Sequence, residues 1–351
     1  MDATVILSAR RSVHMHSRSC VVTSHRAAIH TSDPDASHLE FPMGVRSYLS
    51  NRLRQGGVQT KLLREIRQEL VKMQATNAAM ATQLKKVNKH LERTRQVEEV
   101  IRFSLSEKVL HEVTRFSEES VLDFETTLRR VAKERLSFAR FGDGELRIML
   151  NPDYNLGFQA GSAPLRRDLQ AVLTYQNYDQ DRLLVGFPYL FRSPHWQKVW
   201  SDSWPRLREI LPRDVQYGVA HVSRPIFFGQ VGALGVDLWR EVWDGQRVCV
   251  VTGRGSRFTM VDELFDNVAS VDYLYSEPRN AYGDIGRVLE EAERLDDADL
   301  FLVSLGPAGT ILTAELSRIG KWAIDIGHLS ASYEQAFKGA GEPEDRPVSS
   351  E

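Results

Sequence analysis

The sequence predicts an α/β protein whose mainly parallel, Rossmann-like sheet carries helices on both faces, with a long coiled-coil helix before it. Three patterns lead to this prediction. From residue 118 onward, short apolar runs alternate with amphipathic stretches, as strands and helices do in a parallel sheet. The run Val248–Thr252 is almost continuously apolar, as a strand covered on both faces has to be. Ahead of this region, residues 60–101 repeat apolar side chains with a period of about 3.5.

The composition fits one large domain plus an extension, or two domains. The 351 residues are 42% hydrophobic, which is enough to build a core. No run of 18 apolar residues occurs, so the sequence predicts no membrane-spanning helix. The two cysteines, Cys20 and Cys249, have neither disulfide-framework nor metal-binding spacing, so we expect a reducing, cytoplasmic environment.

Residues 1–42 are rich in Ser, Arg and His and show no stable apolar period. Two interpretations stay open. The segment loosely resembles a transit peptide, or it is an upstream extension assigned in error to a protein whose translation starts at Met43. We expect residues 1–50 to be a disordered or mis-assigned extension and give them no function. The tail, residues 341–351, is also expected to be disordered.

Residues 58–104 are predicted to form a coiled coil, because two interleaved series of mostly apolar residues run through them without Pro or Gly. The series are Leu63, Leu70, Asn77, Leu84 and Leu91 at a positions, and Ile66, Met73, Met80, Val87, Thr94 and Ile101 at d positions. Asn77 at an a position typically fixes the register and the number of strands. We therefore expect self-association through residues 60–101, with the strand number open. The alternative is one long helix that packs on its own domain.

The charge is unevenly distributed along the chain. Residues 52–95 hold 11 Lys or Arg and 3 Glu, a net of +8, whereas residues 96–351 hold 29 basic and 40 acidic residues, a net of -11. A basic arm of this kind attracts an anionic polymer or the inner surface of a membrane, where peripheral contact is expected. The alternative is that Lys and Arg only keep a long helix soluble.

The segment after the coil is expected to begin with an amphipathic helix at Glu118–Arg135, for which Ser120 is the predicted N-cap. Strands are predicted at Phe138–Phe141, Leu183–Phe187, Val215–Ala220, Val248–Thr252, Val271–Tyr275, Leu300–Leu305 and Ala323–Ile326. Helices are predicted between them, for example at Leu165–Thr174, Trp196–Leu211, Gly229–Trp243, Val261–Asn267, Ile285–Leu295 and Ile311–Arg318.

The segment Arg140–Glu145, Arg-Phe-Gly-Asp-Gly-Glu, places two carboxylates one residue apart at a predicted strand end. Gly142 and Gly144 remove steric bulk, so the backbone can turn sharply and a ligand can approach closely. Asp143 and Glu145 supply hard oxygen ligands that suit Mg²⁺ or Mn²⁺ shared with a phosphate group. The alternative is a glycine-rich turn with two solvated acids.

Other predicted strand ends carry groups that suit a phosphate. The turn Gly306–Thr310 precedes a helix, whose free N–H groups and dipole favour an anion. Two further loops add the guanidinium groups of Arg254, Arg257 and Arg224, with His221 beside the last.

The last predicted strand places Asp325 in its interior, where a buried carboxylate needs a partner. We expect His328 or a metal to be that partner. Together, a carboxylate pair, several Arg residues and two glycine turns fit the metal-bound diphosphate of a nucleotide.

Several functional classes lack support. The acidic body and the absence of interleaved basic and aromatic residues argue against nucleic acid as a partner. No Lys follows the Gly306 turn, so it is not a Walker A loop, and no dinucleotide fingerprint, zinc spacing or hydrolase elbow is present.

The stretch from Leu122 to Phe337 resembles the GT-D fold glycosyltransferases, a family long described as a domain of unknown function. The resemblance lies in seven blocks that occur in the same order. They are Arg140–Glu145, Phe158-Gln159, Ser223-Arg224-Pro225, Gly255-Ser256-Arg257 with Glu263-Leu264-Phe265, Pro278–Ala281, Leu305-Gly306-Pro307 with Thr310, and Ala323–His328. It departs from the family at Thr259 and Val261, where glycines are usual, and in the segment Ser332–Gln335.

This resemblance implies a GT-D type domain at residues 118–340 that moves a sugar, expected to be glucose, from a UDP-sugar to a glycan or glycoprotein acceptor. It implies Mn²⁺ or Mg²⁺ held by Asp143 and Glu145. An inverting transfer needs a base for the acceptor hydroxyl, and the candidates are His328, Glu263 and Asp325. The expected substrate-binding residues are Arg140, Gly142, Gln159, Arg224, Ser256, Arg257, Asn280, Gly306 and Thr310.

Two other functions stay open. One is a non-catalytic scaffold that binds a nucleotide or sugar and is assembled by its coiled coil; an intact carboxylate pair argues against it. The other is an α/β methyltransferase, which would explain glycine turns but neither the Arg residues nor a metal pair.

Overall fold

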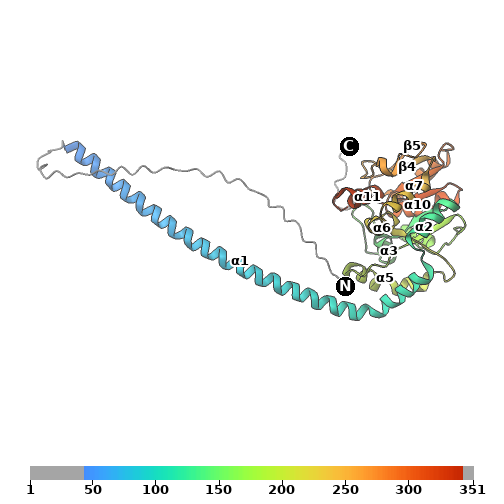
Figure 1. Cartoon of the computed structure of the whole chain (residues 1–351), viewed down its shortest axis with the longest axis horizontal. Coiled ribbons are helices and arrows are strands. Elements are labelled where there is room, and N and C mark those ends of the chain that lie inside the picture. Colours follow the sequence, from blue (N-terminus) through green and yellow to red (C-terminus); the bar gives the residue numbers. More distant parts are fainter. Residues whose placement is uncertain (1–42, 343–351) are drawn as a thin grey trace, which may run out of the picture. The chain divides into compact units, whose positions relative to one another are not determined.

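The computed structural model describes residues 43–342, which divide into two compact units, Met1–Val87 and Asn88–Glu351. The expectations for residues 1–42, and for most of the tail at 341–351, lie outside the described residues. Helix α1, Met43–Ser120, runs through 78 residues and contributes to both units (Figure 1). It begins within the stretch expected to be an extension and continues past the predicted end of the coil at 104. No described helix combines the length and apolarity that crossing a membrane requires.

The predicted seam of α1 is exposed. Leu63, Leu84 and Leu91 are 67%, 62% and 62% exposed, and the d positions Ile66 and Met80 are 47% and 59% exposed. The helix is confirmed over the whole predicted coil, whereas its pairing with another helix stays a prediction.

The second unit contains a seven-stranded sheet in the order β3-β2-β1-β7-β6-β4-β5, and every pair of neighbouring strands is parallel. The strands are β1 Ser137–Arg140, β2 Leu183–Phe187, β3 Gly218–Val219, β4 Arg247–Gly253, β5 Ser270–Ser276, β6 Leu300–Ser304 and β7 Ala323–Asp325. The first three strands extend the sheet to one side of β1, in the order β1, β2, β3. The other four strands lie on the opposite side of β1, and β7 is the one that pairs with β1. The predicted α/β class is confirmed.

Helices cover both faces of this sheet. The first face carries α2 Phe124–Glu134, α6 Pro225–Val231, α7 Ala233–Trp243, α8 Asp262–Phe265 and α11 Leu329–Lys338. The second face carries α3 Asp143–Leu150, α4 Ala163–Leu173, α5 Pro194–Ile210, α9 Ile285–Glu293 and α10 Pro307–Arg318. Two short 3₁₀ helices, η1 Ala220–Ser223 and η2 Ala281–Asp284, lie in loops. Alternate strand residues, such as Val250 and Val251, enter the cores on opposite faces.

The last turns of α1 belong to the globular unit, so this unit begins before residue 118. Val113 is fully buried, and Phe116 packs against Trp204 with ring centroids 5.4 Å apart. The carboxylate of Glu112 accepts hydrogen bonds from Trp204 Nε1 at 2.9 Å and from Arg208 at 3.0 Å. These bonds hold the pKa of Glu112 below its usual value, that from Trp204 most strongly.

The predicted helix Glu118–Arg135 was wrong at its start. α1 ends at Ser120, Val121 forms an isolated bridge with Tyr217, and α2 begins at Phe124. The N-cap is Asp123, whose Oδ1 accepts the Thr126 N–H at 2.7 Å, and not Ser120. The bridge between Val121 and Tyr217 therefore interrupts the helix, although the amphipathic pattern of the sequence continues through this point.

Two more boundaries differ from the prediction. The helix expected over Gly229–Trp243 is two helices that meet at Gly232, whose φ of +65° is incompatible with a continuous helix. The strand expected over Val215–Ala220 retains only two paired residues, and the chain turns into η1 directly after it.

The junction between β1 and β7 is fixed by a buried ion pair. Arg140 Nη2 donates to Asp325 Oδ1 at 3.0 Å, and its Nε donates to the Asp325 carbonyl at 2.6 Å. The same guanidinium donates to the Ala220 carbonyl at 3.0 Å and to Ser223 Oγ at 2.6 Å. Gly327 lies against it, with a φ of +49°, and a Cβ there would collide with the Arg140 guanidinium. One side chain thus joins the ends of three strands.

We expect Arg140→Ala to lower the free energy of unfolding by about 3–5 kcal/mol, because it leaves Asp325 buried without its charged partner. Arg129→Ala, which removes an exposed pair with Glu125, should leave the free energy of unfolding nearly unchanged, because water screens such pairs. Urea unfolding of both variants measures this difference. Equal, small losses would show that the junction does not depend on Arg140.

Candidate active site

The carboxyl-terminal ends of the strands surround a cavity of about 760 Å³. Its walls include the residues that follow β1, β4, β5, β6 and β7, and the 3₁₀ helix after β3. Open parallel sheets bind ligands at this edge, near the point where the strand order reverses, which here is the β1–β7 junction. The volume falls within the usual range for small-molecule sites.

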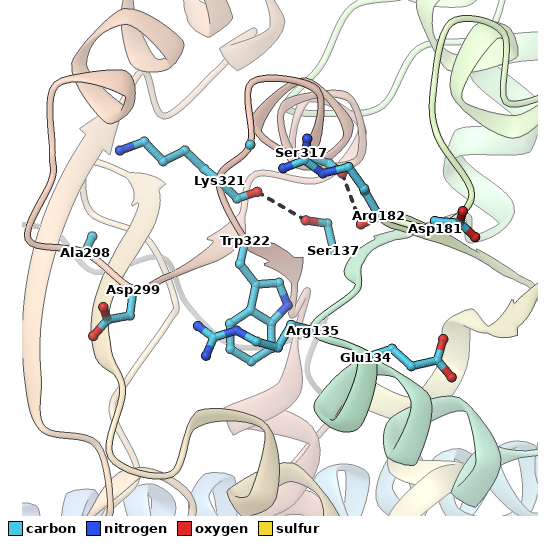
Figure 2. A pocket seen from close by; sticks show the side chains of 11 residues that line it. Glu134, Arg135, Ser137, Asp181, Arg182, Ala298, Asp299, Ser317, Lys321 and Trp322 are labelled. Atoms are coloured by element: carbon cyan, nitrogen blue, oxygen red, sulfur yellow. Dashed lines mark hydrogen bonds between the residues drawn. The ribbon is translucent and has the colours of Figure 1, made fainter.

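A second cavity, of about 330 Å³, lies at the amino-terminal edge of the sheet (Figure 2). The ends of α2 and α10 line it, so helix C-termini face this space. Its hydroxyls are already bonded, since Ser137 donates to the Lys321 carbonyl at 3.4 Å and Ser317 to the Arg182 carbonyl at 3.1 Å. The negative ends of helix dipoles disfavour an anion here, so the carboxyl-terminal edge is the better candidate for a phosphate site.

Asp143 and Glu145 line the larger cavity from the first turn of α3. The helix begins at Asp143, so both carboxylates lie on its first turn. Glu145 Oε2 accepts the Gly142 N–H at 2.8 Å and so caps the helix. Asp143 Oδ2 lies 3.0 Å from His195 Nε2, on the first turn of α5. His195 was not predicted, because it lies 52 residues away and in no motif.

The environment of Glu145 favours a cation. Burial raises the pKa of Glu145 to about 7, and the nearby Asp325 adds to the rise, whereas backbone hydrogen bonds oppose it. In the described residues no cluster of three or more His, Cys, Asp or Glu could hold a metal ion by itself. Two hard carboxylates fit Mg²⁺ or Mn²⁺ only if substrate oxygens and water complete the shell, as a diphosphate would.

The predicted phosphate turn lines the same cavity as this pair. Gly306 has a φ of +55° and leads into α10, and it lines the cavity. A Cβ at Gly306 would lie 2.7 Å from the ring of Phe158, so only glycine fits beneath that ring. Thr310 does not line the cavity. It is fully buried, and its hydroxyl donates to the Arg140 carbonyl at 2.9 Å, so it supports the site from behind.

Cationic side chains line another part of the cavity. Arg224, Ser256 and Arg257 all line the cavity, as predicted from their loops. Arg254 and Arg279 line it as well. Arg254 was predicted to lie at a strand end but was not among the expected substrate-binding residues. The positive charge of Arg279 was not predicted as part of the site, although this residue follows a predicted strand.

Gln159 lines the cavity, whereas Asn280 holds the loop that carries it. The Asn280 N–H donates to the Phe158 carbonyl, and Asn280 Oδ1 accepts the Ala160 N–H, both at 2.8 Å. Gln159 Oε1 accepts the Tyr282 N–H at 3.2 Å. These bonds fix Phe158, which is 48% exposed at the cavity. Asn280 therefore positions this loop and is not among the residues that line the cavity.

The three candidate bases lie in different surroundings. His328 lines the cavity and is exposed at the N-cap of α11. Asp325 is 2% exposed, and it forms an ion pair with Arg140, a partner that had not been predicted. Glu263 lies on α8 outside the cavity, 2.8 Å from Lys338 Nζ, which lowers the pKa of Glu263.

His221 also lines the cavity but is nearly buried, and its Nδ1 accepts the Tyr189 N–H at 3.1 Å. Burial lowers the pKa of His221 well below its usual value, and the positive charges of Arg224 and Arg140 lower it further. The ring is therefore neutral, with its proton on Nε2.

Comparison with known protein families matches residues 138–344 to the glycosyltransferase GT-D fold. The chain is 26% identical over 232 residues to the glycosyltransferase GlyD of Streptococcus pneumoniae serotype 4, covering 63% of this chain and 28% of that protein. It is 25% identical to the probable glycosyl transferase Gly of Streptococcus gordonii, covering 63% and 33% of the two proteins. The chain thus spans about a third of the length of these relatives.

Solved structures give the same assignment. A structure of the domain of unknown function 1792, described as a distinct glycosyltransferase fold, superposes with a TM-score of 0.58 at 27% identity. The superposition covers 68% of this chain and 87% of that chain. A glycosyltransferase of the same domain family from Streptococcus sanguinis gives a TM-score of 0.56 at 27% identity, covering 63% and 85%. Since the family model spans more than half of its residues, the chain belongs to the GT-D fold glycosyltransferases.

Proposed function

We propose that this glycosyltransferase moves a sugar from a UDP-sugar to a glycan or glycoprotein acceptor with the help of Mn²⁺ or Mg²⁺. The observation that carries the proposal is the shared wall of one cavity: two carboxylates, Asp143 and Glu145, and a helix-capping phosphate turn at Gly306. Arg224 and Arg257 complete this wall. Glucose is the proposed sugar, in line with the family resemblance of the motifs.

The donor diphosphate would lie between the carboxylate pair and the start of α10. Asp143 and Glu145 would hold the cation, which when bound offsets the charge that grows on the leaving diphosphate. Arg224, Arg257 and the first N–H groups of α10 would bind phosphate oxygens, because fixed donors stabilise developing charge without reorganising. Phe158 and its hydrogen-bonded loop would keep bulk water from one side.

We propose His328 as the base that takes the acceptor hydroxyl proton in an inverting transfer. Among the three candidates it alone combines exposure with a position in the cavity wall. Asp325 has its charge committed to Arg140, and Glu263 is paired outside the cavity. Asp325 and Arg140 then serve as positioning residues beneath the site.

The metal role predicts that Asp143→Asn and Glu145→Gln abolish Mn²⁺-dependent donor hydrolysis or transfer, and weaken the stabilisation by UDP with Mn²⁺ in thermal unfolding. Gln can still accept the Gly142 N–H, so melting without ligand should change by less than about 1 kcal/mol of stability.

Because Glu145 must lose its proton before it binds a cation, the Mn²⁺ affinity of the UDP complex should rise with pH up to about 7. That dependence should vanish in Glu145→Gln. Full activity in either variant, or in excess chelator, would contradict the metal role. Stabilisation by S-adenosylmethionine but not by UDP would favour a methyltransferase.

Replacement of His328 by Asn should reduce the rate of sugar transfer about 10²–10⁴-fold, the usual contribution of a general base. The affinity for UDP with Mn²⁺ should stay within about twofold, because His328 is assigned to the acceptor and not to the diphosphate. Steady-state kinetics beside calorimetric UDP titration separates these effects. An unchanged transfer rate would remove His328 from the mechanism.

We also propose that α1 assembles the enzyme into a parallel homo-oligomer through residues 60–101. The exposed a and d side chains would be buried in such an assembly, which removes apolar area from water. The net charge of +8 between residues 52 and 95 would place the enzyme peripherally on an anionic inner-membrane surface in the cytoplasm. Salt-sensitive binding to anionic vesicles tests that contact.

Light scattering at micromolar concentration should show an oligomer for the full chain. The double substitution Leu70→Asp and Leu84→Asp should give a monomer that keeps donor hydrolysis, because it buries charge at two a positions. Asn77→Leu should stabilise the coil and broaden the distribution of strand numbers. A monomeric wild-type chain would rule the assembly out.

A further inference from the structure

Ser330 has a buried hydroxyl that forms no hydrogen bond with the described residues. The side chain is 2% exposed, and its Oγ has no hydrogen-bond partner within the part of the chain that the structure describes. A serine inside a helix commonly donates to the carbonyl four residues earlier. For Ser330 that carbonyl belongs to Ile326, which accepts the Leu329 N–H at 3.1 Å. A buried hydroxyl left unbonded is costly, so native structures rarely retain one without a reason.

The position of Ser330 suggests what the partner is. Ser330 lines the larger cavity from the first turn of α11, a helix of ten residues whose N-cap is His328. First-turn N–H groups have no intrahelical acceptor, and the positive end of the dipole lies there. α11 follows β7 and α10 follows β6, and these two strands are neighbours. Two helix N-termini therefore face one cavity from adjacent strand ends.

The surrounding charges favour an anion at this point. The Arg140 guanidinium lies against Gly327, directly before the N-cap of α11. Arg224 and Arg257 line the same cavity. The acids that share the cavity are Asp143, Glu145, Glu277 and Asp325, of which Asp325 is paired with Arg140. The carboxylates of Asp143 and Glu145 are those assigned to the cation.

We propose that the N-terminus of α11, with the Ser330 hydroxyl, binds one phosphate group of the donor diphosphate, while the Gly306 turn of α10 binds the other. The proposal rests on the proposed function and adds a residue to it. The Ser330 hydroxyl, which lines the cavity and has no acceptor among the described residues, would donate to a phosphate oxygen. The ligand class is a nucleoside diphosphate, recognised through its diphosphate and not through its base.

Ser330→Ala tests this directly, and Ser332→Ala is a matched control. Ser332 lies on the same helix, is fully buried and also has an unpartnered Oγ, but it does not line the cavity. Neither substitution removes a hydrogen bond from the unliganded protein, so both variants should melt at or above the wild-type temperature. With Mn²⁺ present, Ser330→Ala should bind UDP and pyrophosphate about tenfold more weakly by calorimetry, because a hydrogen bond to a charged group is lost. Ser332→Ala should bind both as the wild type does.

Three results would overturn the proposal. Unchanged affinity of Ser330→Ala for UDP and pyrophosphate would leave the hydroxyl without a ligand. If Ser330→Ala weakened the binding of UDP-glucose but not that of UDP or pyrophosphate, the hydroxyl would contact the sugar and not the diphosphate. Equal weakening by Ser332→Ala would show an effect of the helix as a whole. Failure of the wild-type chain to bind any of these ligands would instead refute the proposed function together with this addition.

Discussion

The candidate active site of this GT-D fold protein depends on the buried pair between Arg140 and Asp325. Four hydrogen bonds from one guanidinium reach the end of β7 and the turn after β3, so a single side chain fixes three strand ends. Gly327 has no side chain because that guanidinium occupies the space. Thr310 then binds the Arg140 carbonyl and places the start of α10 beside β1. The loops that carry the carboxylates and the phosphate turn begin at these fixed points, so their geometry follows from the pair.

Helix polarity distinguishes the two edges of the sheet. The carboxyl-terminal edge presents the first turns of α3, α10 and α11, where N–H groups and positive dipole ends favour anions. Acidic side chains at the same edge, Asp143 and Glu145, would repel a diphosphate in the absence of a cation. Burial raises the pKa of Glu145 to about 7, and the negative charge of Asp325 adds to the rise. The amino-terminal edge has helix C-termini and bonded hydroxyls, which provide no comparable site (Figure 2).

The sequence predicted most of the architecture because strands buried on both faces have an unambiguous pattern. β2 was predicted at its observed bounds, and β4 within one residue at each end. Pattern alone missed the interruptions at Val121 and Gly232, which come from pairing with Tyr217 and from a positive φ. Most of the site residues predicted on strand-end loops line the cavity. Glu263 lies outside the cavity and pairs with Lys338, and Asp325 pairs with Arg140. His195 and Ser330 could not be predicted from the sequence. Only the tertiary fold brings His195 beside Asp143 and places Ser330 in the cavity wall.

The central claim is that Asp143 and Glu145 share one cation with a donor diphosphate that rests on the start of α10. Anomalous diffraction at the manganese edge, from crystals of the chain grown with Mn²⁺ and UDP, tests it most directly. We expect one anomalous peak within coordinating distance of an oxygen of Asp143 or Glu145 and of an oxygen of the diphosphate. We also expect a phosphate at the Gly306 turn. A diphosphate bound elsewhere, or a manganese peak without contact to either carboxylate, would contradict the account.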